Sequence, residues 1–251
     1  MERKNFLRAF AVAAASGPML IDACKKESAA ASSTSTTTTT GSSTSLTSTN
    51  GSCVVAPTEE EGPFPYAGGE ANNPLARVDV TEGQTGVPLS LTIIVVNTNS
   101  NCNVVSGVRV DMWQCNKDGY YSGYSNQPGV LGTQSYVGKT WLRGYQTTDS
   151  NGQLKFTTIY PGWYSGRATH VHFEVFINGV LKKTTQMAFP ESISDVVQIS
   201  SLYAAHGINT TRNAKDSVFG NSTTDLANET ISLMGSVSAG YSGTFTIGLA
   251  L

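Results

Sequence analysis

The sequence predicts an all-β protein, an antiparallel β-sandwich with long loops between its strands and at most short helices. Short segments rich in Val, Ile, Thr and Tyr alternate between apolar and polar residues, which is the period of a strand with one buried face. Asn, Asp and Gly residues typical of tight turns separate these segments. No long amphipathic helix pattern lies between them, which favours a sandwich over an α/β fold.

The expected strands follow the chain in seven segments. They cover residues 89–96, 108–113, 140–148, 154–159, 170–177, 180–187 and 243–250. Two pairs of these segments are expected to form hairpins, because residues 149–152 and 178–179 tolerate the positive φ of tight turns. Residues 192–205 are expected to hold a short helix.

The first 52 residues are predicted to lie outside the folded domain. Residues 1–23 read as a lipoprotein-type signal peptide, and Cys24 follows in a lipobox-like context, where it would carry a lipid. Residues 24–52 are a Ser/Thr-rich flexible tether. The folded domain, residues 53–251, is therefore expected to be exported by the Sec or the twin-arginine route. It would be held at a bacterial envelope membrane only through lipid on Cys24.

Charge and composition narrow the class of partner. The formal net charge is −2 and charged residues make up 14% of the chain, so no basic surplus exists to neutralise a nucleic acid. Nine Phe, ten Tyr and three Trp provide enough apolar surface for a core. We therefore expect a globular domain that does not bind nucleic acid.

Three cysteines fall within the predicted domain. An exported compartment permits a disulfide, and one cysteine must remain unpaired. Cys102 and Cys115 are expected to lie a strand apart, which leaves Cys53 as the partner of either one.

Two of the three histidines, His170 and His172, lie two residues apart on a predicted strand. Their side chains therefore share a face, and neutral imidazole is a common metal ligand. Glu174 lies on the same face and could complete a zinc or Fe(II) site. Phenolates are the other possible completion, because tyrosines are dense nearby, at Tyr120, Tyr121, Tyr124, Tyr160 and Tyr164.

Several motifs together resemble the intradiol ring-cleavage dioxygenases, the family of catechol 1,2-dioxygenase and protocatechuate 3,4-dioxygenase. They occur in family order and lie at residues 60–66, 110–116, 119–122, 161–164, 167–172 and 184–186. The resemblance extends from about Cys53 to the end of the chain.

The resemblance implies a non-heme Fe(III) ion held by Tyr121, Tyr164, His170 and His172. Glu174 would then be an ordinary strand residue. Two phenolates suit hard ferric iron. The implied reaction cleaves a small aromatic diol between its two hydroxyls with O2 and gives a muconate-type diacid.

The resemblance also assigns catalytic roles. Tyr164 would leave the metal and take a proton from the second hydroxyl of the substrate. Arg167 would stabilise negative charge on the ring, and Gln186 would lie beside the metal ligands without binding the metal. Arg143 is a further cation that could bind a carboxylate on the substrate. His206 is expected to lie in a loop.

Two other functions remain open from the sequence. One is a zinc or Fe(II) enzyme built on His170, His172 and Glu174. The other is a non-catalytic, transthyretin-like surface binding module, which would not need the tyrosines and histidines to converge. The substrate's ring substituents and the oligomeric state are not predicted.

Overall fold

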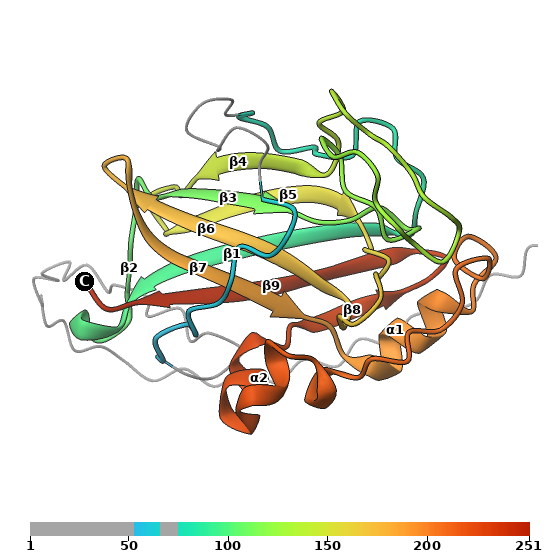
Figure 1. The fold of residues 1–251 in the computed structure, drawn as a ribbon. Helices are drawn as coiled ribbons and strands as arrows, with labels where there is room; N and C mark the ends of the chain where they lie inside the picture. The colour runs from blue at the N-terminus through green and yellow to red at the C-terminus, as the bar shows by residue number, and fades with distance from the viewer. Residues whose placement is uncertain (1–52, 66–74) are drawn as a thin grey trace, which may run out of the picture. The chain divides into compact units, whose positions relative to one another are not determined.

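The computed structural model describes residues 53–65 and 75–251, whose strands form two sheets (Figure 1). The predicted signal peptide, tether and Cys24 lie outside the described residues and stay predictions. The strands are β1 (Pro88–Asn97), β2 (Asn103–Val104), β3 (Arg109–Trp113), β4 (Arg143–Thr147), β5 (Gln153–Ile159), β6 (His170–Ile177), β7 (Val180–Ala188), β8 (Ser232–Ser236) and β9 (Gly240–Leu249). The helices are α1 (Glu191–Gln198) and α2 (Thr223–Glu229), with short 3-10 turns η1 (Thr98–Ser100), η2 (Asn213–Lys215) and η3 (Phe219–Asn221).

The predicted β-sandwich is confirmed. One sheet has the order β2-β1-β9-β8, with β5 also paired to β1, and the other has the order β4-β3-β6-β7. Alternate residues of β1 are buried, as the period of two predicts, and they join the main core. Phe173 of β6 meets Phe245 of β9 across this core with ring centroids 5.8 Å apart, so the two sheets bury their apolar faces against each other.

Strand direction differs from the expectation at one pair. β1 and β9 run parallel, from Leu89 opposite Tyr241 to Asn97 opposite Leu249. The expectation of purely antiparallel sheets is wrong here. Parallel pairing needs a crossover rather than a tight turn, and these two strands come from opposite ends of the domain, so the whole intervening chain serves as the crossover.

One of the two predicted hairpins forms and the other does not. β6 and β7 pair through Asn178 and Gly179, which have φ of 51° and 75°. The hairpin predicted around residues 149–152 is wrong, because β4 pairs with β3 while β5 pairs with β1 in the other sheet. The turn itself exists, since Asp149 Oδ1 accepts bonds from the amides of Asn151 and Gln153, but it carries the chain from one sheet to the other.

The short helix predicted within residues 192–205 is confirmed. It is α1, which ends at Gln198 and is followed by turns. α2 was not predicted, although its first turn carries a recognisable signal. Ser222 Oγ accepts a bond from the amide of Asp225 at 3.2 Å, which is the S-x-x-D capping pattern.

Residues 53–65, called the N-terminal strap below, run across both sheets. Cys53 forms a disulfide with Cys102, with a Cα–Cα distance of 5.5 Å, and Cys115 is free and buried, which settles the choice that the sequence left open. The amide of Ala56 bonds to Gly248 of β9, and the amide of Glu59 to Thr184 of β7. The strap is therefore fixed to both layers before it reaches the site.

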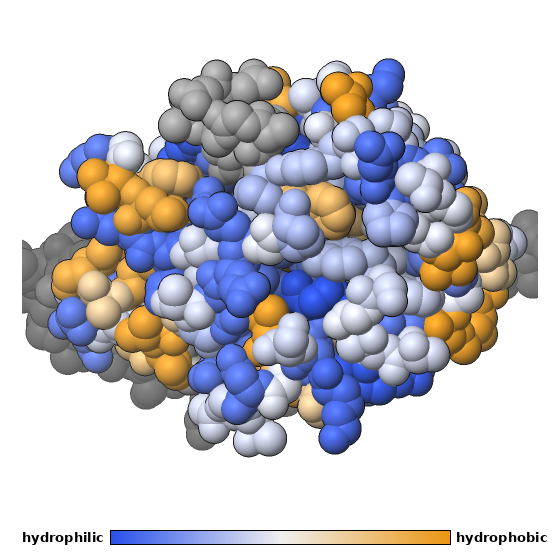
Figure 2. Space-filling view, in the orientation of Figure 1, coloured by the Kyte–Doolittle hydropathy of each residue, from blue (hydrophilic) through white to orange (hydrophobic). Residues whose placement is uncertain are grey.

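The surface is mostly polar on the face seen in Figure 2, where hydrophilic side chains fill the centre and apolar ones gather toward the two sides. Within the part of the chain that the structure describes, no helix is long and apolar enough to cross a membrane.

Candidate metal centre

The two histidines of β6 lie on the face of the sheet that points away from the sandwich core. Val171, Phe173 and Val175 alternate with them and join the core, while both imidazoles are buried beneath loops. The Nε2 atoms of His170 and His172 are 2.9 Å apart. Two donors bound to one ion at about 2.1 Å and at right angles would lie about 3 Å apart, so this separation fits neighbouring ligands.

Each imidazole is held by a different kind of contact. His170 Nδ1 donates to the carbonyl of Ala168 at 2.6 Å, which leaves the lone pair on Nε2. His172 has no hydrogen bond at Nδ1 among the described residues, and its ring instead stacks on Trp113, 4.9 Å away and 6° from parallel. Burial lowers the pKa of His170 to about 3 and that of His172 well below its usual range, so both rings are neutral.

Tyr121 approaches from the loop that follows β3. Its Oη lies 3.3 Å from His170 Nε2, and its ring stacks on Phe64 of the strap with centroids 4.8 Å apart. Gln127 clamps its backbone, with Oε1 accepting from the Tyr121 amide at 2.7 Å and Nε2 donating to the Tyr121 carbonyl at 2.8 Å. Burial raises the pKa of Tyr121 well above the ordinary value, while Arg167 and Arg143 partly offset this.

Tyr164 completes the group from the loop between β5 and β6. Its ring centroid is 5.5 Å from that of His170 and 5.8 Å from that of Tyr121. Its Oη is buried and has no hydrogen-bond partner among the described residues. Burial raises the pKa of Tyr164 to about 12, and the nearby guanidinium of Arg167 limits the rise.

Two glycines let the tyrosine loops touch. Gly119 has φ of +83°, and a Cβ there would lie 2.0 Å from the carbonyl oxygen of Trp163. Gly162 donates its amide to the carbonyl of Asn116 at 3.0 Å, and a Cβ there would lie 2.4 Å from the carbonyl oxygen of Lys117. The backbone contact that these glycines permit therefore sets where Tyr121 and Tyr164 meet.

Arg167 and Gln186 lie together beside the centre. Arg167 Nη2 donates to Gln186 Oε1 at 2.6 Å, and Gln186 Nε2 donates to the carbonyl of Glu60 in the strap at 2.8 Å. The structure thus brings all six predicted site residues into one region: Tyr121, Tyr164, Arg167, His170, His172 and Gln186.

Glu174 does not join the histidines. Its carboxyl faces that of Glu61, and burial followed by repulsion from Glu61 raises the pKa of Glu174 to about 7. Across residues 53–65 and 75–251, no three His, Cys, Asp or Glu side chains converge in a way that could hold a metal. The geometry therefore favours phenolate oxygens over Glu174 as partners of the histidines.

Arg143 and His206 have internal partners. Arg143 is buried, donates from Nε and Nη2 to the side chain and carbonyl of Ser122, and donates from Nη2 to the carbonyl of Phe64. Because it is buried, it is not a surface salt bridge. His206 lies in a loop, as expected, but is buried and donates to the carbonyl of Trp163 at 2.6 Å.

Three contributors were missed from the sequence. Gln127 clamps Tyr121, Phe64 packs against the tyrosines, and Asp216 binds Arg167. Phe64 lies within a motif that the sequence singled out. Nothing in the local sequence around Gln127 or Asp216 signals a site, because their importance arises only when distant loops meet.

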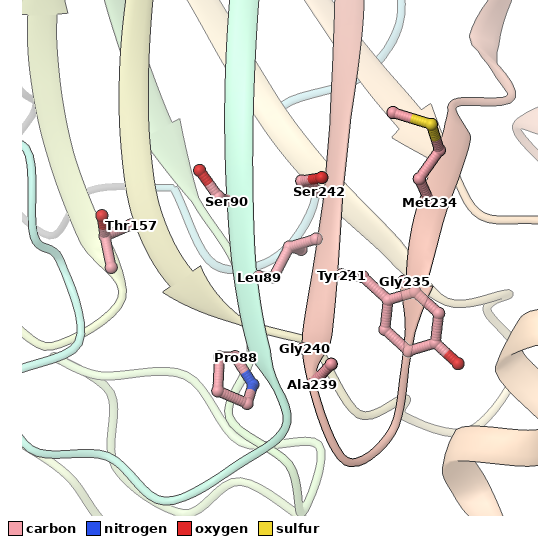
Figure 3. Close-up of a pocket in the computed structure, with 10 residues that line it drawn as sticks. All are labelled: Pro88, Leu89, Ser90, Thr157, Met234, Gly235, Ala239, Gly240, Tyr241 and Ser242. Atoms are coloured by element: carbon pink, nitrogen blue, oxygen red, sulfur yellow. The ribbon is translucent and has the colours of Figure 1, made fainter. Parts of the chain in front are cut away.

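A surface hollow of about 460 Å³ lies elsewhere, on the sheet that holds β1, β8 and β9 (Figure 3). Its lining includes Pro88, Met234 and Tyr241 and none of the six site residues. This hollow is therefore separate from the candidate centre.

Comparison with known proteins finds related dioxygenases. The family described as Dioxygenase matches residues 60–230. Catechol 1,2-dioxygenase 1 of Acinetobacter lwoffii is 28% identical over 148 residues, which are 52% of this chain and 45% of that protein, so the match spans less than half of this relative's length.

Solved structures extend the likeness to nearly the whole domain. An intradiol ring-cleavage dioxygenase from Tetranychus urticae is 29% identical, with a TM-score of 0.68 over 78% of this chain and 95% of that chain. The 3-chlorocatechol 1,2-dioxygenase of Rhodococcus opacus 1CP shares the fold at 18% identity, with a TM-score of 0.52 over 77% of this chain and 72% of that chain. The chain therefore belongs to the family of intradiol ring-cleavage dioxygenases, which are oxidoreductases.

Proposed function

We propose that this protein is a non-heme Fe(III)-dependent dioxygenase that uses O2 to cleave a catechol-type ring between its two hydroxyls, giving a muconate-type diacid. The observation that carries this proposal is the convergence of two phenols and two neutral imidazoles at one buried point. Tyr121 Oη and His172 Nε2 lie 3.3 and 2.9 Å from His170 Nε2.

The donor set fits ferric iron. Phenolate oxygens are hard donors that offset the charge of Fe(III), and neutral imidazoles complete the set at two positions. The buried Oη of Tyr164 has no hydrogen-bond partner within residues 53–65 and 75–251, which suits an atom that would bind a metal. Iron, when bound, would activate the ring of a coordinated catecholate toward O2.

The two tyrosines are held to different degrees, which supports different roles. Tyr121 is fully buried, clamped through its backbone by Gln127 and stacked on Phe64. Tyr164 is half-buried and its phenol has no hydrogen bond among the described residues. We assign to Tyr164 the role of the base: it would help to hold the iron, and its phenolate would take the proton of the second substrate hydroxyl.

Arg167 and the N-terminal strap are placed to stabilise and to cover the aromatic ring of a bound substrate. The guanidinium of Arg167 is always charged and lies where it can stabilise negative charge that develops on the substrate. The strap covers the centre, with Gly62 against His172 and Phe64 against both tyrosines. These residues exclude water and orient the ring.

The substrate is expected to lack a ring carboxylate. Arg143 was the one further cation that could grip such a group, and its guanidinium is already hydrogen-bonded to Ser122 and Phe64. We therefore expect catechol to be a better substrate than protocatechuate.

We also propose that the domain works outside the cytoplasm on a lipid anchor at Cys24. The proposal rests on the basic and apolar pattern of residues 1–23 and on the Ser/Thr-rich tether. The Cys53–Cys102 disulfide agrees with an oxidising compartment.

The test is to purify the iron-loaded protein and compare Tyr164→Phe with Tyr160→Phe. Wild type should contain iron, be wine-red from phenolate-to-iron charge transfer and convert catechol to a ring-opened diacid. Tyr164→Phe should lose about 100-fold or more in rate and much of the colour. Tyr160→Phe removes a buried phenol that bonds Ser194 and should keep both.

A colourless wild type that binds no iron and opens no ring would contradict the proposal. The His/His/Glu alternative makes the opposite prediction for Glu174→Gln, which should abolish metal binding only if Glu174 is a ligand. On the present proposal this variant retains its iron and colour.

A further inference from the structure

The guanidinium of Arg167 is held on two sides by buried groups. Nε donates to Asp216 Oδ2 at 2.8 Å and Nη2 donates to Gln186 Oε1 at 2.6 Å. The Asp216 side chain is fully inaccessible to solvent, and that of Arg167 is 10% exposed. These two hydrogen bonds leave Nη1 as the nitrogen available to a substrate or to Tyr164.

Asp216 is itself fixed by the backbone. Oδ2 also accepts a bond from the amide of Ala168 at 2.6 Å, while Oδ1 accepts from the amides of Val218 at 2.8 Å and Phe219 at 3.2 Å. One carboxylate therefore joins the turn that precedes His170 to the loop between η2 and η3. It has no rotational freedom to lose when Arg167 binds it.

The same loop also places an aromatic ring against the guanidinium. Arg167 Cζ lies 5.7 Å from the ring centroid of Phe219, and the backbone amide of Phe219 donates one of the hydrogen bonds to Asp216. A free arginine side chain has many rotamers, and a substrate that ordered it on binding would lose that entropy. Asp216 thus fixes both the hydrogen bond and the aromatic support that orient Arg167.

We propose that Asp216 is a positioning residue for ring cleavage, which holds Arg167 so that its Nη1 atom points at the bound diol. The inference rests on the proposed function. Charge complementarity supports it. Burial raises the pKa of Asp216, but the hydrogen bond and charge of Arg167, together with the amides of Ala168 and Val218, outweigh it and hold the pKa below its usual range, so the pair remains ionised.

The experiment compares Asp216→Asn, Arg167→Gln and the double variant in the iron-loaded protein. Asn keeps the size of the side chain, but its NH2 group replaces one carboxylate oxygen and would face either Arg167 Nε and the Ala168 amide or the amides of Val218 and Phe219, all of which are donors. We expect kcat/KM for catechol to fall about 100-fold in Asp216→Asn, with changes in both KM and kcat. Iron content and the phenolate-to-iron band should not change, because Asp216 touches none of the proposed ligands.

The double variant separates positioning from a general structural effect. If Asp216 acts through Arg167, the double variant should be no slower than Arg167→Gln alone. Anaerobic titration with catechol, monitored by the visible spectrum, should give the same weakened Kd for the double variant and for Arg167→Gln. Asp195→Asn is the matched control, because Asp195 also bonds an arginine, Arg212, at 2.7 Å but on an exposed surface, and it should leave every measurement unchanged.

Wild-type kinetics in Asp216→Asn, or losses that multiply in the double variant, would overturn the role of Asp216. If the Asn variant does not fold, Asp216→Glu retains the charge but moves it by one methylene, and here too full activity would overturn the proposal. A wild type without iron or ring cleavage would overturn the proposed function together with this inference, whereas a failure confined to the variants bears on Asp216 alone.

Discussion

Gly119 lies where the loop that carries Tyr121 packs closely against the loop that carries Tyr164. Alanine there would combine an unfavourable positive φ, which costs about 1–2 kcal/mol, with a Cβ placed 2.0 Å from the carbonyl oxygen of Trp163. Relieving that overlap costs a further 1–3 kcal/mol or so and shifts the loops apart. We expect Gly119→Ala to lower the free energy of unfolding in urea by about 3 kcal/mol and to weaken iron binding.

Gly138 provides the control for this prediction. It also has a positive φ, +75°, but a Cβ there would meet nothing within 4 Å. Gly138→Ala should therefore lose only the conformational contribution and bind iron as wild type does. Equal destabilisation in the two variants would show that the contact with Trp163 is not important.

Among the elements, α2 and the strap meet through two carboxyl groups. Glu229, the last residue of α2, is fully buried, and neither carboxyl oxygen has a cationic or neutral donor in the described chain. Burial, followed by the charge of Glu59 in the strap, raises the pKa of Glu229 to about 8. Burial likewise raises the pKa of Glu59. Glu229 is therefore held mainly in its protonated form at neutral pH, beside the carboxyl of Glu59.

The pair predicts that stability falls as the solution becomes alkaline. The folded-state pKa of Glu229 lies above its unfolded value, so its contribution is complete below about 4.5 and is lost as pH rises through about 8. The charged groups around the pair are Glu60, Lys183, Arg167, Asp216 and Asp225. We expect urea unfolding of the metal-free protein to show a loss of about 2–4 kcal/mol between pH 5 and pH 9.

Glu229→Gln tests this linkage, because an amide can donate to Glu59 at any pH. The variant should be at least as stable as wild type at pH 9 and lose most of the pH dependence. Asp195→Asn makes the same kind of carboxyl-to-amide change on the exposed surface of α1 and should keep the wild-type slope. If Glu229→Gln retains that slope too, the proton is held elsewhere.

How much of the fold was predictable also differs from element to element. The period of two placed His170 and His172 on one face, and Asn178-Gly179 predicted the β6–β7 hairpin, because both signals are local. The turn at Asp149 was equally clear, yet a turn does not specify which sheet the next strand joins. Asp216 could not be predicted at all, since its bond to Arg167 spans 49 positions and depends on the packing of two loops.

For the whole molecule, the Cys53–Cys102 disulfide closes a covalent loop between residues that are 49 positions apart in the sequence. Loop closure of this length removes chain entropy from the unfolded state worth about 4 kcal/mol. The folded strap keeps other anchors, because Gly248, Thr184 and Gln186 still bond its backbone. Reduction should therefore destabilise the protein without unfolding it at 25 °C.

Urea unfolding with and without a thiol reductant measures this contribution. We expect the reductant to lower the free energy of unfolding of wild type by about 4 kcal/mol and to leave Cys102→Ser unaffected, since that variant has no disulfide to lose. Cys102→Ser without reductant should match reduced wild type, because Cys115 is buried and too inaccessible to form a replacement bond. Equal stability of oxidised and reduced wild type would mean that closing this loop does not restrict the unfolded chain, and that an oxidising compartment adds nothing to the stability of the domain.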